Sequence, residues 1–262
     1  MILSFPFVAA SFDADARAYI NTSGATDRAA INHFVKGMKR LGLYSSMVCW
    51  PLRSSQNAGT GSTAYSLGGL GTYNGTLING PTWGADGVTK TGANQVTRVT
   101  GTDSNLRGCL SIFTCFKSSV QTDNQRPFTC EDGTSAGNYW QINLNNTAKQ
   151  AFVFTSRVSG DNTTTIVDPT GRETAFNYFG SAFANTTAQG FFNGTPTITK
   201  TGLAARNPTG TANVEMLGVQ GADAARGTGA FAVAFVPTLT DSQMTSVYLL
   251  YKSTLGQGLG LP

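Results

Sequence analysis

The stretch Tyr73–Val88 constrains the fold of this chain more than any other feature of its sequence. It contains the run Asn79-Gly80-Pro81 and, a few residues later, Asp86-Gly87. Asn and Gly tolerate a positive φ and Pro presets its own φ, so the first run predicts a tight turn between short strands, and Asp-Gly predicts a second. Such closely spaced turns favour an antiparallel β-sandwich over an α/β enzyme.

The composition suits such a sandwich and argues against a nucleic-acid partner. Charged residues make up 12% of the 262 residues, against about 25% in an average globular chain. The net charge is +4, and the basic residues are scattered apart from Lys36, Lys39 and Arg40. Because nucleic-acid binding needs a clustered basic face, we expect no nucleic-acid partner. A surface poor in charge also suits burial against other proteins.

Cysteine spacing and hydropathy exclude two further classes. The chain has four cysteines: Cys49, Cys109, Cys115 and Cys130. They form no Cys-x-x-Cys pair and His33 is the single histidine, which argues against a zinc site and favours buried free thiols. No run of about 18 apolar residues occurs, so we expect no membrane insertion.

The N-terminal residues 1–12 are predicted to form an extended arm. Residues 1–10 are apolar, but they lack a basic start and contain Pro6, which argues against a signal peptide. An apolar terminus is costly to leave in water. The arm therefore packs on its own domain or inserts into a neighbouring protein, and the sequence leaves both open.

Residues 13–43 are predicted to form a lead-in of two helices. Asp13 and Asp15 favour a helix start, and Gly24 stops that helix. Thr26 is the predicted N-cap of the second helix. Its apolar residues fall on one stripe at helical spacing: Ile31, Phe34, Val35, Met38 and Leu41.

Residues 44–262 are predicted to form the sandwich and a closing C-terminal helix. Segments typical of strands recur along it: 110–116, 139–144, 150–154, 175–179, 190–195, 214–219 and 229–236. Trp50 and Trp83 are expected in the core. The final helix is capped by Thr240 or Asp241 and ends at Gly256, with a flexible tail after it.

Two resemblances support this organisation. The run Gly75–Trp83, Gly-Thr-Leu-Ile-Asn-Gly-Pro-Thr-Trp, is similar to the opening strands of the laminin-G-like, concanavalin A-like jelly-roll family. Segments 16–47 and 231–256 resemble the helical lead-in and the closing strand and helix of tailed-bacteriophage virion proteins. The first resemblance implies a concanavalin A-like (laminin-G-like) antiparallel jelly-roll sandwich. The second implies a virion component, with a helical pair before the sandwich and a C-terminal helix after it.

The chemistry of the acidic residues predicts no enzyme. Glycosidases need paired carboxylates about 5–10 Å apart, and hydrolytic members of the resembled family carry a Glu-x-Asp-x-x-Glu strand. The 14 acidic residues here are dispersed and form no such strand. A hydrolase triad is also poorly supported, because the chain has a single histidine, His33. We therefore expect no catalytic residues.

One loop carries the candidate binding residues. Glu131 and Asp132 could supply oxygen ligands to calcium, although a solvated turn is the simpler interpretation, and no other cofactor is expected. Asn138, Tyr139 and Trp140 could offer a sugar an aromatic surface beside an amide, although core packing of the aromatics is the default.

These observations leave three hypotheses about function. The first is a non-enzymatic structural protein of a phage virion, decorating the capsid or attached to the tail and assembled in the host cytoplasm. It would bind other virion proteins and form a homo-oligomer, which strengthens weak contacts through avidity. The second is an adhesin that binds a host-surface glycan on the same fold. The third is a glycan depolymerase.

Overall fold

The structure is a computed structural model, and it describes most of the chain in several ranges. The described residues are 11–92, 94–100, 104–119, 125–131, 139–145, 150–153, 164–167, 175–184, 186–202, 213–218 and 225–262. For some of these only the backbone is described. The predicted arm lies outside the described residues, except for Ser11 and Phe12.

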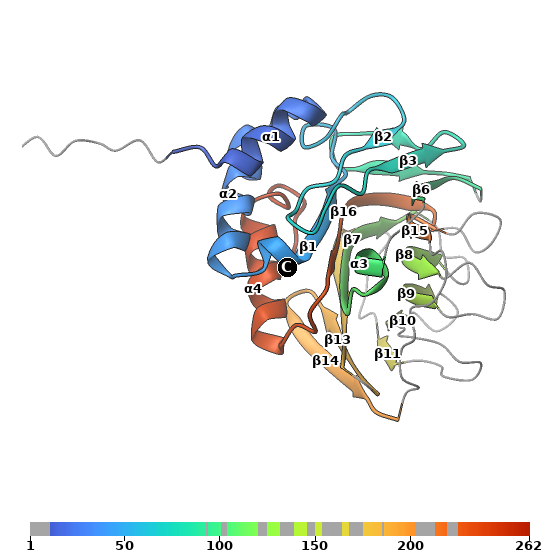
Figure 1. Cartoon of the computed structure of the whole chain (residues 1–262). Helices are drawn as coiled ribbons and strands as arrows, with labels where there is room; N and C mark the ends of the chain where they lie inside the picture. The colour runs from blue at the N-terminus through green and yellow to red at the C-terminus, as the bar shows by residue number, and fades with distance from the viewer. Residues whose placement is uncertain are drawn as a thin grey trace, which may run out of the picture.

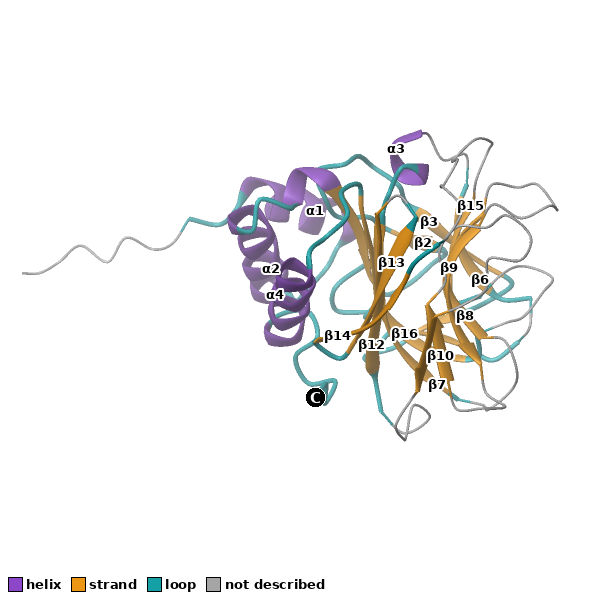
Figure 2. Cartoon of the chain, turned by 90° about the horizontal axis from the view of Figure 1, so that it is seen from below, coloured by secondary structure: helices purple, strands orange, loops and turns teal. Residues whose placement is uncertain are grey.

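The described chain forms three layers, with helices on one face of a sheet and a second sheet on its other face (Figures 1 and 2). The helices are α1 (Ala14–Ser23), α2 (Arg28–Arg40), the short α3 (Ser104–Arg107) and α4 (Asp241–Ser253). We call the middle layer the inner sheet and the layer away from α1, α2 and α4 the outer sheet.

Both sheets are antiparallel throughout their described pairings. The inner sheet has the order β14-β13-β12-β7-β16-β5-β4, with β1 also paired to β16. Its strands are β1 (Met47–Pro51), β4 (Thr82–Trp83), β5 (Val88–Lys90), β7 (Ser111–Ser118), β12 (Asn177–Ala184), β13 (Thr187–Phe192), β14 (Thr195–Lys200) and β16 (Gly227–Phe235).

The outer sheet has the order β11-β10-β9-β8-β15-β6-β3-β2. Its strands are β2 (Thr63–Ala64), β3 (Gly75–Ile78), β6 (Val96–Val99), β8 (Gln125–Glu131), β9 (Tyr139–Asn145), β10 (Gln150–Val153), β11 (Thr164–Val167) and β15 (Asn213–Met216). The predicted fold class is confirmed: the chain is mainly β, an antiparallel jelly-roll sandwich with an N-terminal helical pair and a C-terminal helix.

The turn at Asn79-Gly80 is confirmed, and it has a larger role than a hairpin. Both residues have positive φ, 61° and 79°. The strands on either side pair with different sheets, β3 with β6 and β4 with β5. The turn therefore carries the chain from the outer sheet to the inner sheet.

The apolar stripe of α2 packs on the inner sheet of its own chain. Ile31, Phe34, Val35 and Met38 are fully buried. The Phe34 ring meets Phe231 of β16 edge-on at 5.7 Å between centroids. Phe231 in turn stacks on Tyr251 of α4 at 4.4 Å. The N-cap prediction was wrong by one residue: α2 begins after Asp27, because the amides of both Thr26 and Asp27 donate to the Ser55 carbonyl.

The C-terminal segment also belongs to this core. Thr240 and Gln243 form a reciprocal capping box at the start of α4. The prediction of a flexible tail after Gly256 was wrong, because Leu259 and Leu261 are buried and the Tyr248 hydroxyl donates to the Pro262 carbonyl. Of the tryptophans, Trp50 is buried as predicted.

Trp83 departs from the prediction that both tryptophans lie in the core. It is half-buried, and its indole N–H donates to the Gly61 carbonyl at 3.0 Å. The three cysteines whose side chains are described, Cys49, Cys109 and Cys115, are buried free thiols as expected.

Candidate functional site

The residues predicted to bind sugar or calcium lie at one end of β8 and β9. Glu131 ends β8 and is paired in register with Tyr139, which begins β9 and precedes Trp140. The structure describes the backbone of these three residues but not their side chains, and Asp132 and Asn138 lie outside the described residues. Both assignments therefore stay predictions. Among the described side chains, no group of three or more His, Cys, Asp and Glu could hold a metal ion.

A row of polar residues runs across the strands of the outer sheet. Its member on β8 is Thr129, two residues before Glu131. The register aligns five of them on neighbouring strands: Thr76, Arg98, Glu215, Thr129 and Gln141. Their neighbours along the strands, such as Val99 and Val214, belong to the core between the sheets. Because side chains alternate along a strand, the row faces away from that core.

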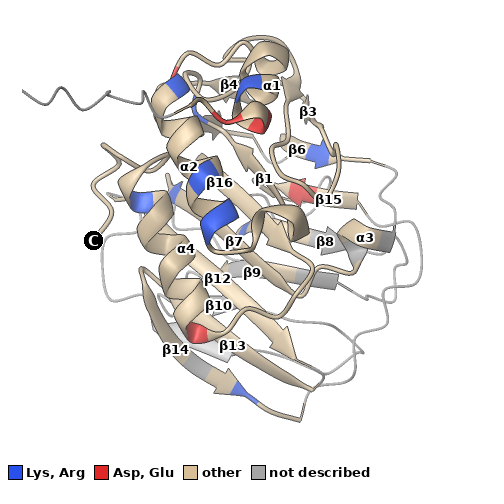
Figure 3. Ribbon diagram, turned by 60° about the vertical axis from the view of Figure 1, so that its left-hand side comes forward, with Lys and Arg blue, Asp and Glu red and all other residues tan. Residues whose placement is uncertain are grey.

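An ion pair sits at the centre of this polar row. Arg98 Nε donates to Glu215 Oε1 at 2.6 Å, and Glu215 is 2% exposed. Figure 3 shows the basic position on β6 beside the acidic position on β15. The Thr129 hydroxyl and Gln141 Oε1 are buried and have no hydrogen-bond partner in the described part of the chain. Such unpartnered atoms cost about 1–3 kcal/mol each.

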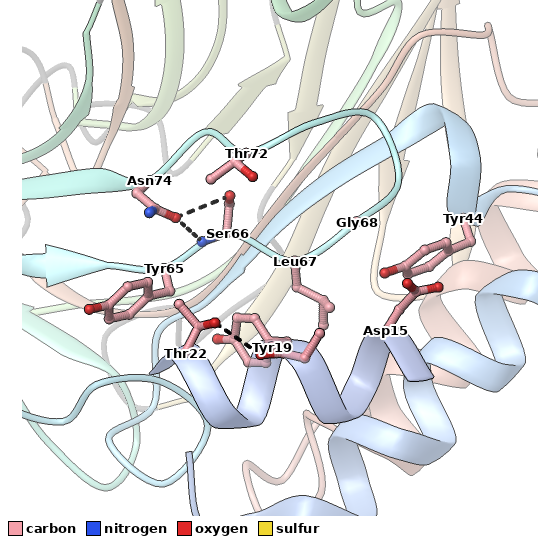
Figure 4. Close-up of a pocket in the computed structure, with 11 residues that line it drawn as sticks. Asp15, Tyr19, Thr22, Tyr44, Tyr65, Ser66, Leu67, Gly68, Thr72 and Asn74 are labelled. Carbon is pink, nitrogen blue, oxygen red and sulfur yellow. Dashed lines mark hydrogen bonds between the residues drawn. The ribbon is translucent and has the colours of Figure 1, made fainter. Parts of the chain in front are cut away.

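A hollow of about 230 Å³ lies between α1 and the segment 65–74 (Figure 4). Residues of α1 form one side, the segment 65–74 forms the other, and Tyr44 closes one end. The residues that line it are Asp15, Ala18, Tyr19, Thr22, Tyr44, Tyr65, Ser66, Leu67, Gly68, Thr72 and Asn74. Sequence reasoning did not find this site, because its residues come from three separate segments and form no motif.

Hydrogen bonds hold both sides of the hollow in place. Leu67 and Cys49 of β1 exchange hydrogen bonds of 2.7 and 2.8 Å, which fixes the loop against the inner sheet. At Gly68 φ is 142°, and a Cβ would stand 2.2 Å from the Met47 carbonyl oxygen, so only glycine allows this approach. On the other side, the buried Tyr19 hydroxyl donates to the Gln56 carbonyl at 2.8 Å and fixes α1.

Several polar groups around the hollow have unused hydrogen-bonding capacity. Asn74 Oδ1 accepts from the amide and the hydroxyl of Ser66 at 2.9 and 3.3 Å, which leaves the Asn74 amide N–H groups unbonded among the described residues. The hydroxyls of Tyr44, Tyr65 and Thr72 likewise form no hydrogen bond within the described chain. Both tyrosines are half-buried, so each offers part of a ring as well as a hydroxyl.

The charged groups form a cluster at the Tyr44 end of the hollow. Lys39 Nζ lies 2.8 Å from Asp13 Oδ1 and 2.6 Å from Asp15 Oδ2, and 5.1 Å from the centre of the Tyr44 ring. The hydrogen bonds that Lys39 donates to the two carboxylates raise the pKa of Lys39. Burial, reinforced by the Asp15 carboxylate, raises the pKa of Tyr44 far above its ordinary value. Tyr44 therefore keeps its proton and remains a hydrogen-bond donor.

Comparisons with known proteins show the fold and leave the family open. No family model matches the chain, and no curated protein sequence matches it. A mutant of Trypanosoma rangeli sialidase displaying trans-sialidase activity matches 87% of this chain with a TM-score of 0.61 and 11% identity. A leech intramolecular trans-sialidase matches 61% of it with a TM-score of 0.50 and 17% identity. The matches span 39% and 26% of those two chains, so this chain is much shorter than either.

A third structure, the CBM40 module of Ruminococcus gnavus IT-sialidase bound to α2,3 sialyllactose, matches 54% of this chain and 84% of its own. Its TM-score is 0.46 and its identity is 17%. The leech and Trypanosoma rangeli structures are not virion proteins, so the phage resemblance gains no support from them.

The prediction that the chain is not an enzyme is contradicted by these comparisons. The solved structures that share its fold include a sialidase and a trans-sialidase, which are enzymes. The prediction rested on carboxylates that are dispersed along the sequence. Catalytic groups need to converge in space and can come from separate segments. Dispersed acidic residues therefore give no ground for excluding catalysis.

Proposed function

We propose that this chain is a carbohydrate-binding protein that holds a sugar in the hollow between α1 and segment 65–74. The observation that carries the proposal is the lining: half-buried Tyr44 and Tyr65 stand beside unbonded hydroxyl and amide groups. Sugars present apolar C–H faces and a rim of hydroxyls. The tyrosine rings can stack on the C–H faces, and the hydroxyl and amide groups can form hydrogen bonds with the rim.

The volume of the hollow limits what it can enclose. At about 230 Å³ it is smaller than the roughly 300–1,000 Å³ of sites for drug-sized ligands. One sugar ring at the end or side of a glycan is therefore the proposed occupant. The Trypanosoma rangeli sialidase that shares the fold has been observed in complex with sialic acid, which makes glycans the class of ligand to screen first.

The virion remains the proposed setting for this binding protein. Its support is the resemblance of segments 16–47 and 231–256 to phage virion proteins. The apolar stripe of α2 is occupied inside the chain, so we assign attachment to other virion proteins to residues 1–10. On this proposal, deleting residues 1–10 abolishes co-purification with virions and leaves glycan binding unchanged.

Tyr65→Ala tests the proposed sugar site directly. Removing the ring should weaken binding to a glycan identified by array screening about tenfold or more, the effect of losing roughly 1.4 kcal/mol. Isothermal titration calorimetry measures the change. Leu249→Ala is the matched control, because it removes a side chain that is 55% exposed on α4, outside the hollow.

Two further variants decide between the hollow and the end of β8 and β9 as the sugar site. If Tyr139→Ala or Trp140→Ala abolishes binding while Tyr65→Ala does not, the sugar site lies at the end of β8 and β9, and the hollow is excluded. Analysis of the glycan after incubation adds a separate readout, because release of shorter sugars would assign the chain a hydrolytic activity. No binding to any glycan on the array would contradict the proposed function.

A further inference from the structure

The charge around the hollow bears on which sugars it can take. Among the described residues that line the hollow, Asp15 is the charged one. The nearby ammonium group of Lys39 is engaged by both Asp13 and Asp15. Two carboxylates against one ammonium leave this cluster with one negative charge. A ligand entering at the Tyr44 end therefore meets the Asp15 carboxylate as the charged group of the lining.

A sugar carboxylate would find poor partners in this environment. Proteins bind carboxylates through charge-assisted hydrogen bonds, above all from the two parallel N–H groups of an arginine. No arginine lines the described hollow, and Lys39 already forms two ion pairs. An incoming carboxylate would have to displace Asp15 from Lys39 or lie beside a like charge.

A neutral sugar would find matching partners in the same place. The Asp15 carboxylate can accept hydrogen bonds from sugar hydroxyls, and the Tyr44 hydroxyl, which keeps its proton, can donate one. Across the hollow the Asn74 amide supplies two further donors, held in orientation by the Ser66 contacts to its oxygen. Donors and acceptors thus face a polyol from both sides.

We infer that the hollow selects uncharged sugars and rejects sialic acid and other carboxylated sugars. The inference rests on the proposed function and narrows it. It also separates this chain from what its structural neighbours bind: one was solved with sialic acid and another with a sialic acid derivative.

The test compares paired glycans that differ by one carboxylated sugar. The probes are neutral oligosaccharides, lactose among them, each matched with its sialylated form, as in 3′-sialyllactose. For wild-type protein we expect at least tenfold tighter binding of the neutral member by calorimetry. Asp15→Asn removes the net charge of the cluster with almost no change in shape. It should weaken neutral-sugar binding and shrink the preference severalfold.

Asp241→Asn is the matched control for this substitution. Asp241 is an exposed acidic residue in the first turn of α4, as Asp15 is in α1, and it lies outside the hollow. It should leave both affinities unchanged. Equal or tighter binding of the sialylated forms, lost in Tyr65→Ala, would overturn the inference while keeping the sugar site. Binding of neither form would overturn the proposed function itself.

Discussion

At the scale of single residues, Lys90 is a buried charge whose cost depends on pH. It lies on β5 with 0% exposure, and its Nζ donates to the Leu217 carbonyl. Burial lowers the pKa of Lys90 from 10.5 to about 8, although Glu215 partly opposes the shift. The folded chain therefore holds its proton less tightly than the unfolded chain does.

This shift predicts how stability changes with pH. Between about pH 8 and 10.5 the unfolded state binds more protons at this lysine, so the contribution of Lys90 to stability rises with pH and is constant below about 8. The full change is about 3 kcal/mol. The measurement is urea unfolding of wild type and Lys90→Met from pH 7 to roughly 9.5, below the pKa of unfolded tyrosines.

The difference between wild type and Lys90→Met isolates this lysine from other titrating groups. We expect the stability of wild type relative to the variant to rise across that range above pH 8. A difference that stays constant with pH would show that the lysine is solvated in the folded state.

At the scale of elements, Phe34 is one of the buried side chains that hold α2 on the inner sheet. The side chain is fully buried and meets Phe231 edge-on. Phe34→Ala should cost about 3–5 kcal/mol, because it removes a buried ring and leaves a cavity. Thermal unfolding measures the loss. Leu249→Ala, an exposed change on α4, should stay within about 0.5 kcal/mol of wild type. Equal effects of the two variants would mean that α2 is not docked on the sheet.

The elements that the sequence predicted correctly are those with local signals. The apolar stripe of Ile31, Phe34, Val35 and Met38 predicts α2. The Asn79-Gly80 and Asn193-Gly194 runs predict turns, and both residues of each run have positive φ. The sheet that each strand joins is set by pairing between distant segments, which no local signal carries. For that reason the turn at Asn79 could not be recognised as a crossing between sheets.

The ion pair and the hollow both depend on contacts between segments that lie far apart in the sequence. Arg98 and Glu215 lie 117 residues apart and meet only because β6 and β15 are neighbours. The hollow joins α1 to segment 65–74 and to Tyr44, and none of these carries a recognisable motif. The sequence instead predicted a sugar site at Tyr139 and Trp140, because two adjacent aromatics beside an Asn form a local pattern.

At the scale of the whole molecule, the helices and the two sheets give the hollow its fixed shape. The helical layer and the inner sheet share one hydrophobic cluster, which includes α1, α2, α4 and the C-terminal segment. The wall formed by α1 and the wall formed by segment 65–74 are therefore both anchored to the inner sheet. A rigid site of this kind loses little entropy when a ligand binds.

Backbone NMR during titration with the best neutral glycan from the array tests whether a sugar binds in the hollow. Amide shifts should saturate with the ligand and cluster at residues 15–22, 44 and 65–74. They should disappear in Tyr65→Ala and persist in Leu249→Ala. Shifts confined to residues 139–145, or the absence of any saturable shift, would contradict the assignment of the hollow as the sugar site.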